Sequence, residues 1–281
     1  MGQQSGVPES REYLRDEIRK IEQWEKEQKD VFFWEKIGRI PFMLLDKITP
    51  KVIKDKIGTA LNELGGFVQS GGQYLVKEST VLKRLQKAAG EEESLTLAQV
   101  STLPVAVMDQ TADDLAAGRI TLATAQGATT GFGGFFTLAA DIPLVLGLSL
   151  KVLQEMAICY GFDPKDKRER VFIIKCLQFA SSDIVGKKAV LEELARYDAP
   201  RDGEDQVAAQ IQGWREVLNT YRDNFGWKKL FQLVPVAGML FGSLINRSAI
   251  GDVAEAGKML YKKRRILQRL AEEEGAAADS N

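Results

Sequence analysis

The sequence predicts an all-α protein that folds as a single compact domain of several helices. Apolar residues recur at spacings of three and four along most of the chain, which is the period of a helix with one buried face. No run alternates apolar and polar residues for long enough to form strands, and no β-branched run is bounded by hairpin turns. With 281 residues, of which 44% are hydrophobic and 27% charged, the chain can bury a sizeable core.

The first predicted helix begins at Arg11, after a flexible tail of residues 1–10. Its apolar stripe consists of Leu14, Ile18, Ile21 and Trp24. An aromatic segment follows at Phe32, Phe33 and Trp34, with basic residues nearby. This composition suits either a core helix or a helix that lies at a membrane surface.

The middle of the chain continues the helical pattern. We expect a helix to start at Pro50, a surface loop at residues 91–94, and a helix over 97–117 with Pro104 near its start or at a kink. Gly161 and Pro164 predict a helix stop followed by a helix start, because glycine suits the position after a helix and proline its first turn. Later apolar stripes predict further helices, the clearest of them over 207–221.

The central segment, residues 120–150, contains one charge, Asp141. Its helix-packing glycines include Gly127, Gly131, Gly133 and Gly134, and the first two have the spacing that lets helix backbones approach closely. Asp141 is a good N-cap, and Pro143 would then lie in the first turn of the next helix. We therefore expect a glycine-rich apolar hairpin with a bend between residues 131 and 141. Its length allows either burial in the protein or insertion in a membrane.

A second segment, residues 230–246, is uncharged and contains Gly238 and Gly242 at the same close-packing spacing. A basic cluster follows it: Lys258, Lys262, Lys263, Arg264, Arg265 and Arg269. These six cations could contact anionic lipid, as could the aromatic segment, or they could form a solvated helix face balanced by Glu272 to Glu274. Residues 271–281 are expected to form a flexible acidic tail.

Several chemistries are excluded or unsupported. The chain contains no histidine, so histidine bases, histidine metal ligands and catalytic triads are absent. A net charge of -1 gives no general footprint for nucleic acid. The two cysteines have no CxxC spacing and fit a reducing, cytoplasmic compartment, and the polar N-terminal residues contain no secretion signal. No cofactor or metal site is expected. Asp141 and Glu155 form a candidate polar site, provided that the bend brings them together.

The motifs of the central segment resemble those of the EcsC protein family. The likeness covers roughly residues 20 to 270 and is densest from residue 109 to residue 164. The positions that carry it are architectural: Gly131, Gly133, Gly134, Asp141, Pro143, Gly161 and Pro164, with Gly238 and Gly242 further on. The resemblance places the family domain at residues 11–270 and supplies no catalytic residues.

The resemblance implies a bacterial accessory protein of the membrane, linked to an ABC transporter or to secretion. Combined with the charge-poor segments, it favours a non-enzymatic protein that is cytoplasmic and peripheral at the inner face of the plasma membrane. Its expected partner is the membrane surface or a membrane protein. Two alternatives stay open: a soluble protein-interaction module, and an enzyme that acts on a lipid or another apolar substrate through Asp141 and Glu155.

Overall fold

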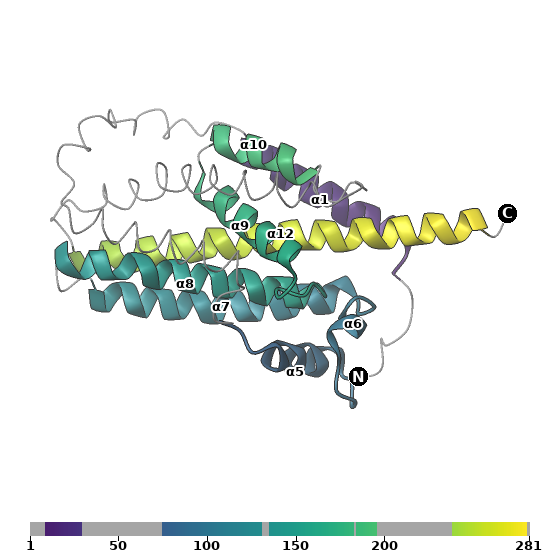
Figure 1. The fold of residues 1–281 in the computed structure, drawn as a ribbon, viewed down its shortest axis with the longest axis horizontal. Helices are drawn as coiled ribbons and strands as arrows, with labels where there is room; N and C mark the ends of the chain where they lie inside the picture. Colours follow the sequence, from purple (N-terminus) through teal and green to yellow (C-terminus); the bar gives the residue numbers. More distant parts are fainter. Residues whose placement is uncertain (1–8, 30–74, 131–134, 183, 196–237, 280–281) are drawn as a thin grey trace.

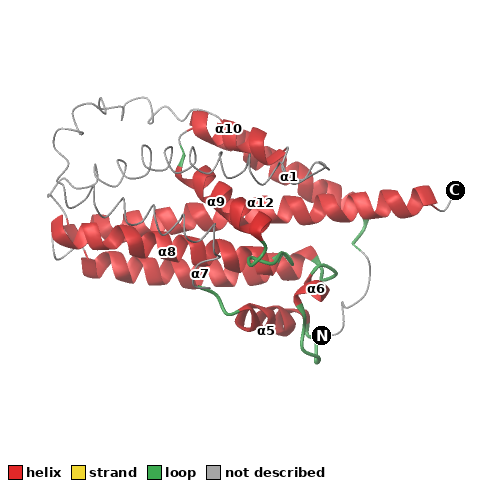
Figure 2. Ribbon diagram, viewed as in Figure 1, coloured by secondary structure: helices red, strands yellow, loops and turns green. Residues whose placement is uncertain are grey.

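The computed structural model describes residues 9–29, 75–130, 135–182, 184–195 and 238–279. Every element in these ranges is a helix and none is a strand, which confirms the predicted all-α class (Figure 2). In chain order the helices are α1 (Arg11–Lys29), α5 (Glu78–Ala89), α6 (Leu97–Val100), α7 (Val105–Thr130), α8 (Phe135–Cys159), α9 (Lys167–Ser181), α10 (Ile184–Ala195) and α12 (Gly238–Asp279).

Three long helices, α7, α8 and α12, pack side by side at the centre of the molecule (Figure 1). On one side of this layer α9 packs against α8 and α12, α10 packs against α9, and α1 contacts α10 and α12. On the other side α5 contacts α7 and α8, with the short α6 beside it. The central layer is therefore covered on both sides over part of its length.

The core lies where α8, α9 and α12 meet. Phe172 and Tyr261 are buried with their ring centroids 4.8 Å apart, and Trp24 of α1 lies 5.5 Å from Phe179 of α9. Leu14, Ile21 and Trp24 are buried, as the apolar stripe of the first helix predicts. Burying one such side chain contributes roughly 1.5–3 kcal/mol, so α1 is attached mainly by this stripe.

The helix expected over residues 97–117 is divided in two. The short α6 ends at Val100, and α7 begins at Val105, directly after Pro104. Because proline cannot supply the backbone donor of a helix interior, the break falls at this residue. The first N–H of α7 is satisfied from the N-terminus of the chain, since the Val105 N–H donates to the Glu9 carboxylate at 2.8 Å.

The central segment differs from its prediction. Since α8 begins at Phe135, Asp141 and Pro143 lie inside this helix rather than at its N-cap and first turn. Residues 135–140, five of which are apolar, extend the helix past the local signal of Asp141, and α8 packs along α7 and α12. Gly127 lies in α7, whereas Gly131, Gly133 and Gly134 lie outside the described residues.

The predicted stop at Gly161 is confirmed. Gly161 has a φ of 76° and its N–H donates to the Ile158 carbonyl at 3.0 Å, while the Phe162 N–H donates to the Ala157 carbonyl at 2.9 Å. This pair of bonds is the Schellman arrangement that closes a helix end. Pro164 does not lie in the first turn of the next helix, because α9 begins at Lys167 with Asp166 as its N-cap. The Asp166 side chain accepts the Arg168 N–H, so this cap sets the start.

The basic cluster belongs to α12, a helix of 42 residues that also contains Gly238 and Gly242. This helix continues to Asp279 and so includes residues 271–279 of the expected flexible tail. The aromatic segment at Phe32, Phe33 and Trp34, the helix expected at Pro50, the one over 207–221 and residues 230–237 lie outside the described residues.

Candidate functional site

The six cations that the sequence offers for lipid contact are all engaged within the protein. Lys262 is buried, and its Nζ donates to Glu17 of α1 and, at 2.6 Å, to Asp109 of α7. Tyr160 donates to the same Asp109 carboxylate at 2.6 Å. Burial alone would lower the pKa of Lys262, but the hydrogen bonds to Asp109 and Glu17 outweigh it and raise this pKa above its usual value. Lys262 is therefore a charged link between α1, α7 and α12.

The neighbouring arginines join α12 to the ends of other helices. Arg264 forms two hydrogen bonds to Glu169 of α9, at 2.8 and 2.9 Å, and lies over the rings of Phe162 and Phe172. Arg265 donates to the Tyr160 and Gly161 carbonyls at the end of α8. Burial lowers the pKa of Arg265 to about 10.

The remaining three cations complete the pattern. Arg269 donates to the carbonyls of Ser101 and Leu103 and to Glu9. Lys258 pairs with Asp113 at 2.7 Å, and Lys263 pairs with Glu25 at 2.8 Å. A buried charge that loses its partner is costly, so the buried Lys262, Arg264 and Arg265 hold the helices together. Lys258 pairs with an exposed carboxylate and is held less firmly. A small cavity of about 240 Å³ beside Lys263 and Arg264 is lined mostly by apolar side chains, and both of these cations are already paired with carboxylates.

The candidate polar site is not assembled. Asp141 and Glu155 lie on one continuous helix, fourteen residues apart, which is about 21 Å along the axis. Glu155 is buried and accepts two hydrogen bonds from Arg119, at 2.5 and 2.9 Å. Within the described ranges no cluster of three or more metal-binding side chains occurs.

Both cysteines, Cys159 and Cys176, are buried and free. Burial raises the pKa of each thiol well above its usual value, so neither has the character of a nucleophile.

One end of the central layer carries almost no charge. Here the last part of α7 (120–130), the first part of α8 (135–150) and the first part of α12 (238–246) come together, with Asp141 as the one charged residue among them. We call this region the charge-poor end; it is the end of the molecule opposite the C-terminus (Figure 1). Ion pairs resume at Arg119 and Glu155, next to its boundary.

The described surface of the charge-poor end includes apolar side chains that contact solvent. Leu122 is 50% exposed, and Ala125, one turn further along α7, is also exposed. No described helix is long and apolar enough to span a membrane. The sequence identified the charge-poor segments separately; that α7, α8 and α12 place them at the same end follows from their packing.

These features define the class of protein: a helical bundle in which cations of α12 bond to neighbouring helices and in which three charge-poor helix ends meet at one end. The EcsC protein family model matches residues 15–266. The chain belongs to the EcsC protein family.

Two relatives from Bacillus subtilis (strain 168) illustrate this membership. The chain is 57% identical to the uncharacterized protein YdbA over 266 residues, which cover 95% of this chain and 97% of YdbA. It is 33% identical to Protein EcsC over 152 residues, which cover 54% of this chain and 61% of that protein. No solved structure matches this chain.

Proposed function

We propose that this protein is a non-enzymatic accessory protein that binds the inner face of the plasma membrane by inserting its charge-poor end into one leaflet. The observation that carries the proposal is the meeting of three charge-poor helix ends at one end of the bundle. The exposed Leu122 and Ala125 support it, because apolar side chains gain free energy when a membrane removes them from water.

The dimensions of the charge-poor end suit one leaflet. Its α7 part, residues 120–130, is about 15 Å long at 1.5 Å per residue, and one leaflet of a hydrocarbon core about 30 Å thick is about 15 Å deep. Asp141 lies six residues from the start of α8, or about 9 Å. Insertion to that depth keeps Asp141 near the headgroups and removes Ala125, which is about 8 Å from the end of α7, from water. Leu122, about 12 Å from the same end, then lies at the level of the headgroups.

Membership of the family indicates the cellular process that membrane binding would serve. The EcsC resemblance implies a link to an ABC transporter or to secretion, so the proposed role is support of a membrane protein at the inner face. An enzymatic role through Asp141 and Glu155 is not proposed, because the straight course of α8 keeps the two residues about 21 Å apart.

Membrane fractionation with an exposed alanine variant tests the proposal. Ala125→Glu places a charge within the charge-poor end, where a carboxylate opposes insertion. We expect the wild-type protein to stay with membranes in high salt and to be released by detergent. The variant should bind vesicles at least tenfold more weakly, on the order of 1.4 kcal/mol.

Ala117→Glu is the matched control, because Ala117 is exposed on the same helix eight residues earlier, outside the charge-poor end. It should bind membranes as the wild type does. A wild-type protein that stays in the soluble fraction at every salt concentration would contradict membrane binding. Equal losses for the two variants would show that membranes contact another part of the protein.

A further inference from the structure

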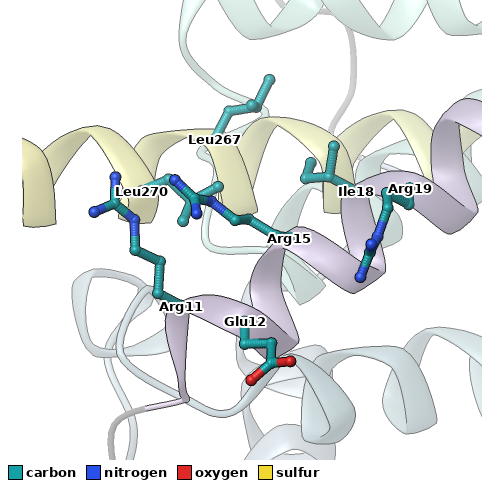
Figure 3. Close-up of a pocket in the computed structure, with 7 residues that line it drawn as sticks. All are labelled: Arg11, Glu12, Arg15, Ile18, Arg19, Leu267 and Leu270. Atoms are coloured by element: carbon teal, nitrogen blue, oxygen red, sulfur yellow. The ribbon is translucent and has the colours of Figure 1, made fainter.

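A groove lies between α1 and the C-terminal part of α12. Its exposed arginines and its exposed leucine belong neither to the hydrophobic core nor to the charge-poor end. Its volume is about 650 Å³, and its lining residues are Arg11, Glu12, Arg15, Ile18, Arg19, Leu267 and Leu270 (Figure 3). The three arginines follow one another at intervals of four residues, so they extend along one side of α1 for about 12 Å.

The apolar part of the groove is open to solvent. Leu267 is 46% exposed, and Ile18 and Leu270 are partly buried against the small core cluster between the two helices. Figure 3 shows Arg11 and Arg15 extending to the side of Leu270. An apolar strip is thus bordered by three arginines and one carboxylate, Glu12, so the lining carries an excess of positive charge.

The arginines of the groove differ from the six cations of α12 described above. Arg15 is exposed and has no carboxylate within ion-pair distance among the described residues. Arg11 pairs with Glu274 and Arg19 with Asp16, but all four of these side chains are at least 43% exposed. Exposed ion pairs contribute little in water, so carboxylates of a partner can replace them.

We propose that this groove binds an acidic amphipathic helix of a partner protein. Two helices side by side form an elongated trough, which fits a third helix better than it fits a flat bilayer. Carboxylates one turn apart on the partner would meet the arginine row, and its leucines would cover Leu267 and Leu270. The groove also lies near the C-terminal end of α12, away from the charge-poor end.

The test measures binding of a fluorescent synthetic peptide, an amphipathic helix with glutamates beside a leucine stripe. A second peptide has glutamine in place of each glutamate. We expect the acidic peptide to bind the wild-type protein at least tenfold more tightly than the neutral one, and salt to weaken this binding. Arg15→Glu should weaken it at least tenfold, and Leu267→Ser should also weaken it.

Lys83→Glu provides the matched control, because Lys83 is exposed on α5, outside the groove. It should bind the acidic peptide as the wild type does. Equal binding of the two peptides, or equal losses for Arg15→Glu and Lys83→Glu, would overturn the proposal. So would an Arg15→Glu variant that keeps its affinity for the peptide but loses binding to phosphatidylglycerol vesicles, since the groove would then contact lipid. These outcomes do not depend on membrane insertion, which Ala125→Glu tests separately.

Discussion

Gly161 shows how one residue can join two parts of the molecule. It ends α8 in the left-handed conformation, and its carbonyl accepts a hydrogen bond from Arg265 of α12. A Cβ at this position would lie 3.0 Å from Arg265 Nη2 and 3.1 Å from the Ser101 backbone nitrogen. Gly90 ends α5 with nearly the same φ, 72°, but a Cβ there would meet nothing within 4 Å. A comparison of the two glycines therefore separates the cost of a left-handed backbone from the cost of crowding by neighbouring atoms.

Replacing each of these glycines with alanine should give different losses of stability. Gly90→Ala should lower the free energy of unfolding by about 1–2 kcal/mol, the cost of a left-handed alanine. Gly161→Ala should lower it further, by about 2–4 kcal/mol in total, because the backbone of Ser101 must also move. Urea unfolding of the two variants and the wild type measures both values. Equal losses would mean that the contact with Ser101 relaxes without cost.

At the scale of elements, α12 shows what could be predicted from the sequence and what could not. Lys258, Lys262, Arg265 and Arg269 follow spacings of four, three and four, which place them on one side of a helix. This period was available in the sequence and indicates a shared face. The sequence does not show which helices this face contacts, because its partners are at least 145 residues away along the chain. These partners are Glu17, Asp109 and Asp113.

The same limit explains the error in the central segment. Asp141 and Pro143 are local signals for a helix start, and they were interpreted as one. The packing of α8 along α7 and α12 depends on residues far away in the chain and extends the helix to Phe135. At Gly161 the local signal and the packing agree, and there the prediction was right.

The contact between Lys262 and Glu17 should make stability depend on pH in the acid range. Burial raises the pKa of Glu17, but hydrogen bonds from Lys20 and Lys262 outweigh it, so this pKa lies below its usual value in the folded protein. A carboxylate with a lowered pKa stabilises the fold above its unfolded pKa of about 4.5, and this contribution is lost as the pH falls through the folded pKa.

Glu17→Gln should therefore cost most near neutral pH, about 1.5–3 kcal/mol, and less as the pH falls below about 4.5. Urea unfolding of the wild type and the variant at pH values of about 7, 5, 4 and 3 measures this difference. These values span the range in which carboxylates titrate. Burial raises the pKa of Glu9 and gives the opposite trend, and the nearby charge of Glu17 adds to that rise, so the variant also lowers the pKa of Glu9 and the measured difference contains this second, smaller contribution. A difference that stays constant with pH would show that the Glu17 charge does not stabilise the fold.

At the scale of the whole molecule, the charges divide the bundle into regions. Ion pairs connect α1, α7, α9 and α12 in the body, the charge-poor end lies at one extremity, and the arginine groove lies toward the other. Along α12, Gly238 and Leu267 are twenty-nine residues apart, or about 44 Å. With a membrane at Gly238, Leu267 stays clear of the bilayer, so the two proposed surfaces can be occupied at the same time.

The last prediction follows from this separation: the protein should bind a vesicle and an acidic helix at the same time. In a flotation assay the labelled acidic peptide should rise with vesicles only when the protein is present. Its affinity for vesicle-bound protein should equal that for free protein within about twofold, because sites without shared partners are independent. Arg15→Glu should leave the protein on the vesicles without the peptide, whereas Ala125→Glu should leave both in the dense fraction. Displacement of the protein from vesicles by the peptide would show instead that lipid and helix compete for one surface, and the groove rather than the charge-poor end would then be the membrane contact.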